Sequence, residues 1–163
     1  MSVKTSALAV LVTLSTAFAA AAQPARVKQF DDWGVYSYGG GAAKRCYVLS
    51  VPTSALPESV NHGENYFLVA PEGSSMMPQA IMGYDLKSDS TIKVEIGGDT
   101  FTLVPKDNAA WVRDPSREPA LVDAMRGGSE MTLQATSQRG TATTYSYSLK
   151  GVTAALKEVR SCR

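Results

Sequence analysis

Alternation of apolar and polar residues with a period of two is the feature that most restricts the fold of this 163-residue chain. The clearest case covers residues 92–104, where apolar residues alternate with Lys, Glu and Thr on both sides of Gly97-Gly98-Asp99. Successive side chains of a strand point to opposite faces, so this pattern predicts two half-buried strands joined by a tight turn. Residues 130–137 and 141–149 flank Gln138-Arg139-Gly140 and predict a second hairpin. The chain is therefore expected to be mainly β.

Further segments have the β-branched and aromatic composition that is typical of strands. They are residues 30–38, 45–51, 65–70, 81–86 and 108–112. Residues 52–64 contain two prolines and a glycine and are expected to form a loop.

Two segments show helical spacing instead. Residues 116–126 begin at Ser116, which can cap a helix, and are followed by Gly127-Gly128 as a stop signal. In the second segment, apolar residues and a cysteine recur at steps of three and four, which places them on one face of a helix. They are Val152, Ala155, Leu156, Val159 and Cys162. Cys162 is therefore expected to point toward the sheet on which this helix packs.

The first 22 residues have the composition of a cleaved secretory signal peptide. A basic residue precedes an apolar stretch, and Ala17-Phe18-Ala19 and Ala20-Ala21-Ala22 both fit the A-x-A pattern recognised by signal peptidase. The apolar stretch is shorter than the roughly 20 residues that span a membrane. We expect cleavage after Ala19 or Ala22, export to the periplasm or the outer surface, and one mature domain over residues 23–163.

The charge balance argues against recognition of polyanions. Removing the signal peptide takes away one lysine and leaves 141 residues with 15 basic and 15 acidic side chains. Nucleic-acid-binding domains usually carry a basic face and a high pI, and strong membrane-surface binding needs a polybasic segment or a lipid. We therefore predict no nucleic-acid partner and no transmembrane segment; the expected partner is another protein.

Cys46 and Cys162 are the only two cysteines in the sequence. An even number in an oxidising compartment favours a disulfide, here between residues 116 positions apart. The alternatives are a thiol nucleophile, which needs an activating base, and a zinc site, which needs four clustered ligands. His62 is the only histidine and lies in a loop-like segment, so the disulfide is favoured over both.

No cluster of residues with catalytic spacing stands out. His62 is expected to be a surface loop residue, because no nucleophile-elbow motif accompanies it. Asp31 and Asp32 resemble a carboxylate pair, but neighbours on a strand point to opposite faces, so we expect one solvated and one turn-forming aspartate. Trp33 and Trp111 are expected to fill the core. We predict no catalytic residue, no metal ligand and no cofactor.

The second hairpin carries the most suggestive surface. Arg139, next to Gly140 at the tip, has a side chain that can bind a carboxylate or phosphate, although turn chemistry alone explains the pair. Thr144, Ser146 and Ser148 share one face of the last strand, which suits either strand addition to another protein or an ordinary solvated face. These five residues are the candidate interaction surface.

Eight short motifs occur in an order that resembles a known family. They are Phe-Asp-Asp-Trp at 30–33, Lys-Arg-Cys-Tyr at 44–47, Gly-Gly-Asp-Thr-Phe-Thr-Leu at 97–103, Ala-Ala-Trp at 109–111, Ala-Met-Arg-Gly-Gly-Ser at 124–129, Ser-Gln-Arg-Gly-Thr at 137–141, Tyr-Ser-Leu-Lys-Gly at 147–151 and Ala-Ala-Leu at 154–156. Together with Cys162, they make the chain similar to the invasion-associated locus B family of exported bacterial proteins. No single motif is specific, but their order is.

The resemblance implies a small, mainly β, antiparallel β-sandwich with two short helices, the C-terminal one tethered by the paired cysteines. Relatives are linked to host-cell invasion, and no catalytic residues come with the family. We therefore expect a non-enzymatic envelope protein that acts through protein contacts, in host-cell invasion or adhesion or in envelope integrity. The alternative is a periplasmic small-molecule binding or inhibitor module whose cavity is lined by aromatic residues. Those residues are Trp33, Tyr36, Tyr38, Tyr47 and Trp111.

Overall fold

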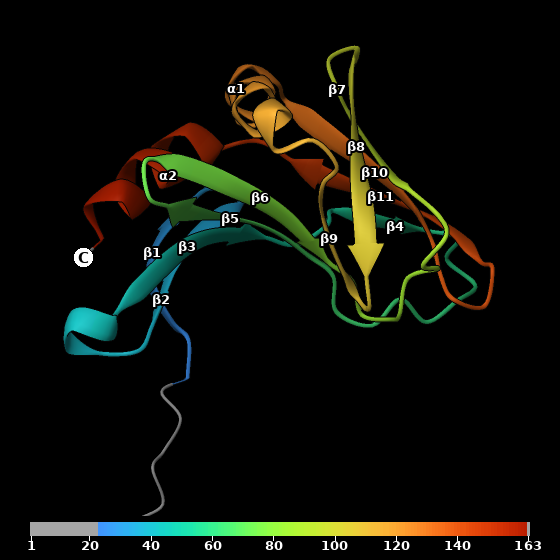
Figure 1. The fold of residues 1–163 in the computed structure, drawn as a ribbon, viewed down its shortest axis with the longest axis horizontal. Helices are drawn as coiled ribbons and strands as arrows, with labels where there is room; N and C mark the ends of the chain where they lie inside the picture. Colours follow the sequence, from blue (N-terminus) through green and yellow to red (C-terminus); the bar gives the residue numbers. More distant parts are fainter. Residues whose placement is uncertain (1–22, 163) are drawn as a thin grey trace, which may run out of the picture.

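The computed structural model describes residues 23–162, and within them one antiparallel sheet of eleven strands carries two α-helices (Figure 1). The strands are β1 Ala25–Phe30, β2 Trp33–Tyr38, β3 Arg45–Ser50, β4 Ser54–Leu56, β5 Tyr66–Glu72, β6 Ser75–Ile81, β7 Ile92–Ile96, β8 Asp99–Lys106, β9 Ala109–Val112, β10 Glu130–Thr136 and β11 Ala142–Ser148. The helices are α1 Glu118–Gly127 and α2 Val152–Ser161, and the 3-10 turns are η1 Gly41–Ala43 and η2 Pro115–Arg117. The predicted mainly β antiparallel fold with two short helices is confirmed.

One continuous sheet supplies both layers of this sandwich-like fold. Its strand order is β1-β2-β3-β5-β6-β9-β8-β7-β10-β11-β4. The sheet curls until β2 meets β11, where Trp33 Nε1–H donates a hydrogen bond to the Ser148 carbonyl at 3.0 Å. Across the interior, Phe67 on β5 packs against Tyr147 on β11 with ring centroids 6.1 Å apart. The two layers are therefore opposite ends of one folded sheet.

The inward-facing residues of strands and helices form a single apolar core. Trp33, Tyr145 and Tyr147 are its largest fully buried side chains, which confirms the prediction for Trp33. The apolar stripe of α2 is buried against the sheet, as its spacing predicted. Both helices lie on the same side of β3, β5 and β6 (Figure 1), and their buried residues belong to this core. Among the described residues, no helix covers the opposite face of these strands.

A disulfide between Cys46 and Cys162 joins β3 to the end of α2. The two Cα atoms are 6.0 Å apart, and 116 positions separate the residues in sequence. Cys46 is buried on the inward side of β3, the side on which α2 packs. The predicted pairing and the tethered helix are confirmed. The thiol-nucleophile and zinc alternatives are wrong, because each sulfur is bonded to the other.

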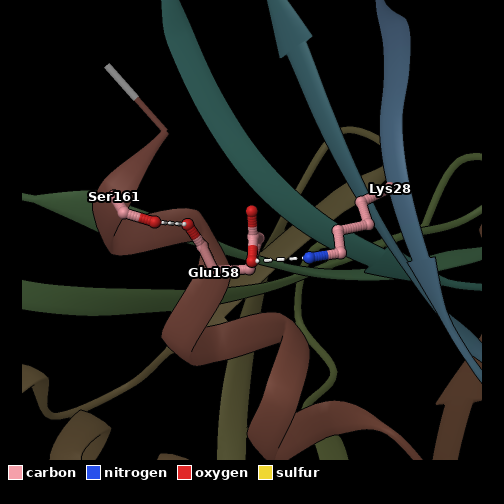
Figure 2. Close-up of polar contacts among 3 residues, drawn as sticks. All are labelled: Lys28, Glu158 and Ser161. Carbon is pink, nitrogen blue, oxygen red and sulfur yellow. Dashed lines mark hydrogen bonds and ion pairs between the residues drawn. The ribbon is translucent and has the colours of Figure 1, made fainter.

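A weaker link also connects α2 to the sheet. Lys28 Nζ on β1 lies 3.1 Å from Glu158 Oε2 on α2, and the Ser161 hydroxyl donates to the Glu158 carbonyl at 2.8 Å (Figure 2). Both charged side chains are partly exposed to solvent. Because exposed ion pairs stabilise proteins by at most about 1 kcal/mol, this link adds little to the disulfide and to the buried apolar stripe of α2.

Both predicted hairpins are confirmed. In the first, β7 and β8 pair Ile96 with Asp99 around a two-residue turn. Gly97 and Gly98 adopt φ angles of 57° and 102° there, a conformation that glycine takes without steric cost and that this type of turn requires. In the second, β10 and β11 pair along their whole length.

Residues 30–38 were expected to form one strand, and this prediction is wrong. Asp31 has a φ of 46° and, with Asp32, makes a turn that separates β1 from β2. Aspartate tolerates this left-handed conformation better than most residues, so the turn needs no glycine. One solvated and one turn-forming aspartate were expected; both aspartates lie in this turn and both are exposed, so no carboxylate pair is buried.

Two further boundaries differ from the sequence prediction. The strand expected over residues 81–86 lies earlier, because β6 ends at Ile81 and Leu86 makes only an isolated bridge to Ser137. Pro78 in the middle of β6 conceals this strand from a pattern analysis, since proline is rare inside strands. The loop expected over residues 52–64 contains the three-residue strand β4, which pairs with β11.

The first helix begins later than its sequence indicates. Ser116 does not cap it: Asp114 caps the 3-10 turn that precedes the helix, because its Oδ1 accepts a hydrogen bond from the Ser116 N–H at 3.0 Å, and the N-cap of the helix itself is Arg117. The turn η2 follows, and α1 begins at Glu118. Hydrogen bonds from Ser116 lower the pKa of the Asp114 carboxyl, which keeps this cap ionised.

No helix within residues 23–162 has the length and apolar character needed to cross a membrane. The expected signal peptide and its two cleavage motifs lie outside the described residues.

Candidate interaction sites

The five candidate interaction residues lie along one hairpin but in two environments. Arg139 and Gly140 are exposed at the tip between β10 and β11. Thr144, Ser146 and Ser148 are half-buried on the outward side of β11. The hydrogen-bonding edge of β11 is occupied by β4 along Thr144 to Ser146, so strand addition there requires β4 to leave. An interaction role for these residues stays a prediction.

Beside the hairpin tip, a chain of hydrogen bonds joins His62 to Thr143. The Tyr145 hydroxyl lies 2.8 Å from His62 Nδ1 and 3.2 Å from the Tyr84 hydroxyl, which in turn lies 2.6 Å from Thr143 Oγ1. His62 Nε2 lies 3.0 Å from the Pro57 carbonyl. A carbonyl only accepts, so His62 Nε2 carries a proton and donates to Pro57. His62 lies in a loop as predicted, but it is half-buried with both ring nitrogens engaged.

This hydrogen-bond chain keeps the side chains from His62 to Thr143 in fixed positions. Burial raises the pKa of Tyr145 far above its ordinary range, and the hydrogen bond to Tyr84 adds to the effect, so the hydroxyl stays protonated. Among residues 23–162, the side-chain hydrogen-bond partner of His62 is the Tyr145 hydroxyl, and no serine or cysteine side chain bonds to its ring. The same part of the chain holds no group of three or more acidic, histidine or cysteine side chains able to bind a metal.

Asn65 and Gly83 fix the loop that carries His62. The buried Asn65 amide donates to the His62 carbonyl at 3.0 Å, and its oxygen accepts from the Gly83 N–H at 3.1 Å. A Cβ on Gly83 would lie 2.5 Å from the His62 carbonyl oxygen, so only glycine permits this approach. Sequence reasoning missed these residues, because the two loops that they join are 18 positions apart.

A pocket of about 500 Å³ lies between the His62 chain and the hairpin tip. Its walls come from residues 60–62, residues 84–85 and the hairpin residues 137–143. The hairpin wall is tied to the opposite wall by the Gln138 N–H, which donates to the Asp85 carbonyl at 2.8 Å. Arg139, predicted from its place at the tip, lines this pocket, whereas Tyr84 and Asp85 carried no sequence signal.

Tyr145 and Tyr147 provide a matched test of the hydrogen-bond chain. The Tyr147 hydroxyl is buried without a hydrogen-bond partner in the described structure. Removing it in Tyr147→Phe relieves a desolvation cost, so we expect the free energy of unfolding to stay constant or rise by about 1 kcal/mol. Tyr145→Phe leaves His62 Nδ1 unpaired and is expected to lower it by about 1 to 3 kcal/mol. Urea unfolding measures both, and equal losses would contradict the assignment.

A second candidate site is the outward face of β2, β3, β5, β6 and β9. Cross-strand partners point to the same side, so the charged Arg45, opposite Tyr38, and Glu72, opposite Ser75, lie at the margins of this face. Register and burial place ten large uncharged residues on the same face. They are Tyr36, Tyr38, Tyr47, Leu49, Tyr66, Leu68, Met77, Gln79, Ile81 and Trp111. We call this set the tyrosine face. All ten are partly or fully exposed, and none carries a charge at neutral pH.

The tyrosine rings form an ordered group on this face. Tyr36 stacks on Tyr47 with centroids 5.6 Å apart, and Tyr38 lies 6.1 Å from Tyr47 with 47% of its surface exposed. Partial burial raises the pKa of Tyr47, and its neighbours Tyr36 and Tyr38 add to the shift. The Tyr66 hydroxyl donates a hydrogen bond to the Glu64 carboxylate at the margin of the face. These contacts order the rings before any partner arrives.

The location of the aromatic residues corrects two expectations. Trp111 is half-buried on the tyrosine face rather than in the core, because its neighbours Ala110 and Val112 take the inward positions of β9. The five aromatic residues proposed to line one cavity do not converge. Trp33 is in the core, and the other four point outward.

Comparison with known proteins now identifies the family. A family model described as "Invasion associated locus B (IalB) protein" matches residues 33–160, from β2 into α2. The chain belongs to this family. The matched range includes every residue of the tyrosine face and the walls of the pocket. The resemblance inferred from the eight motifs is therefore confirmed.

A crystal structure of invasion-associated protein B from Bartonella henselae resembles this chain with a TM-score of 0.61 and 12% sequence identity. The match covers 82% of this chain and 95% of that one. At this identity, the likeness between these two IalB-type proteins shows a shared fold and nothing finer. No curated protein matches the sequence.

Proposed function

We propose that this protein is an exported, non-enzymatic envelope protein that acts by binding another protein through its tyrosine face. Membership of the IalB family supports the envelope assignment, and a disulfide suits an oxidising compartment. The composition of the tyrosine face carries the proposal. Interface centres are enriched in Tyr, Trp and Met and depleted in Lys, Glu and Asp, and this face has that composition.

The chemistry of the face also restricts the partner. Stacked tyrosines supply large apolar area at low conformational-entropy cost, and their hydroxyls add directional hydrogen bonds. The face offers no countercharge at its centre, so a partner's charged side chain buried there would stay unpaired at considerable cost. We therefore expect the partner to present an apolar, uncharged surface, in the cell envelope or on a host cell.

Site-specific photo-crosslinking in the native envelope tests this proposal. A photoreactive phenylalanine analogue at Tyr47 is expected to capture one discrete protein partner. The same analogue at Asp123, which is exposed on α1 away from the face, serves as the control. Substituting Tyr36 with Ser, with the crosslinker still at Tyr47, should weaken capture by about tenfold, since Tyr and Trp dominate interface energetics. Equal capture from both positions would contradict the proposal, and so would a catalytic turnover abolished by a single substitution.

The location of the protein in the cell distinguishes host contact from a role in envelope integrity. Antibody labelling and protease cleavage of intact cells would place the protein on the surface and favour host contact. A protected pool released with the periplasm would favour a role in envelope integrity.

A further inference from the structure

We propose that the pocket between the β10–β11 tip and Tyr84 binds a small zwitterion of the α-amino-acid type. This inference goes beyond the protein contact proposed above and concerns a separate part of the molecule. The pocket, at about 500 Å³, falls within the range of small-molecule sites and is ample for one amino acid.

The pocket contains one cation and one anion that do not neutralise each other. Arg139 and Asp85 both line it, and neither forms an ion pair within residues 23–162. The nearby cation Lys87 is already paired with Asp89 at 3.6 Å. A guanidinium binds a carboxylate through two parallel hydrogen bonds, and a carboxylate accepts from an ammonium. The two charges therefore complement a ligand that carries both groups.

Other classes of ligand fit this pair of charges less well. A phosphate or polyanion would meet a single arginine and be repelled by Asp85. A simple carboxylate or a simple amine would leave one of the two charges without a partner. Uncharged groups complete the lining: the Asn61 and Gln138 amides and the Thr141 hydroxyl offer further hydrogen bonds to a ligand.

The walls of the pocket are held in place by backbone hydrogen bonds. The Gln138 N–H donates to the Asp85 carbonyl at 2.8 Å, and the Lys87 N–H donates to the Thr136 carbonyl at 3.0 Å. The tip itself is closed by the Gly140 N–H, which donates to the Ser137 carbonyl at 2.8 Å. The main chains that carry Arg139 and Asp85 thus keep their separation, which reduces the ordering cost of binding.

The floor of the pocket is rigid for a different reason. Tyr84 and Thr143 line the pocket, and their hydroxyls bond to each other at 2.6 Å. The same chain continues through Tyr145 to His62, whose ring is fixed at both nitrogens. A ligand therefore meets a preformed surface and gains its specificity from the charged side chains at the rim.

Titration of the mature, oxidised protein with L-alanine tests the proposal by amide NMR. Saturable shifts are expected at Tyr84 and Gln138. Arg139→Gln and Asp85→Asn should each weaken binding by about tenfold or more, because each removes a charge-assisted hydrogen bond. Lys87→Gln is the matched control, since it removes a neighbouring charge that is already paired, and it should bind L-alanine as the parent does. Unfolding midpoints of the variants verify that each remains folded.

Three comparison probes separate the features of the ligand. Acetate carries only the carboxylate, ethylamine carries only the ammonium, and glucose carries neither charge. Acetate and ethylamine should bind at least about tenfold more weakly than L-alanine. The absence of saturable shifts with L-alanine up to about 10 mM, well above a millimolar dissociation constant, would overturn the proposal. Equal binding of glucose, or unchanged affinity in both charge variants, would also overturn it. None of these outcomes bears on the tyrosine face.

Discussion

Removal of the Cys46–Cys162 disulfide is expected to lower the free energy of unfolding by about 2 to 5 kcal/mol. The bond closes a loop of 116 positions, so its loss returns a large conformational entropy to the unfolded chain. Urea unfolding of the oxidised protein and of the Cys46→Ser/Cys162→Ser double variant measures the difference. The double variant avoids a lone reactive thiol. Coincident transitions for the two proteins would contradict this expectation.

Removal of the disulfide is expected to destabilise the end of α2 before the rest of the fold. Without the disulfide, the ion pair between Lys28 and Glu158 is the polar side-chain link that remains between the last turns of α2 and the sheet among the described residues, and such pairs contribute at most about 1 kcal/mol. The buried stripe of α2 keeps the helix docked, but its end is expected to open more often. Faster amide exchange at residues 157–161 than at β10 would show this local opening.

Gly151→Ala is expected to lower the free energy of unfolding by about 3 kcal/mol or more. Gly151 has a φ of 86°, and an added Cβ would lie 2.0 Å from the carbonyl oxygen of Phe30. The backbone has little room to move away, because the Lys150 carbonyl accepts from the Asp32 N–H and the Ser148 carbonyl accepts from Trp33. The substitution would therefore force apart the junction where β2 meets β11.

Gly73→Ala is the matched control for this substitution. Gly73 also has a positive φ, 58°, but nothing lies within 4 Å of its added Cβ. Only the conformational preference is lost there, so we expect a decrease of about 1 to 2 kcal/mol. Urea unfolding followed by the fluorescence of Trp33 and Trp111 separates the two effects. Equal destabilisation by both variants would show that the contact with Phe30 is easily relieved.

Local features of the sequence account for the parts of the fold that were predicted correctly. The β7–β8 hairpin combines period-two alternation with a glycine pair, and both act over a few residues. The apolar stripe of α2 likewise requires only steps of three and four. The disulfide followed from the cysteine count and from the face on which Cys162 falls.

Structure that depends on distant partners could not be predicted in this way. β4 has three residues with no strand-like pattern, and its pairing with a strand almost ninety positions later defines it. Alternation in β9 was visible, but the larger Trp111 faces outward while the smaller Ala110 faces the core. Residue size was therefore a poor guide to which face is buried.

The same distinction between local features and distant partners applies to the candidate sites. Arg139 was noticed because a hairpin tip is a local feature, whereas its oppositely charged neighbour Asp85 reaches the same pocket only through the tertiary fold. The tyrosine face was missed as a unit, because its rings come from separate strands. Sequence reasoning grouped Tyr36, Tyr38 and Tyr47 correctly but expected them to line a cavity.

The curled sheet also determines when this protein can fold. The inner faces of β2, β3 and β5 come early in the chain, yet β11 and α2, which cover them, lie about a hundred positions later. Until those late segments are available, the early strands can pair with one another, but the residues of β11 and α2 that cover their apolar sides are missing. The closing contacts thus have high contact order, and their loop-closure entropy must be overcome in one late step. The sheet therefore cannot close before the chain has been synthesised as far as α2.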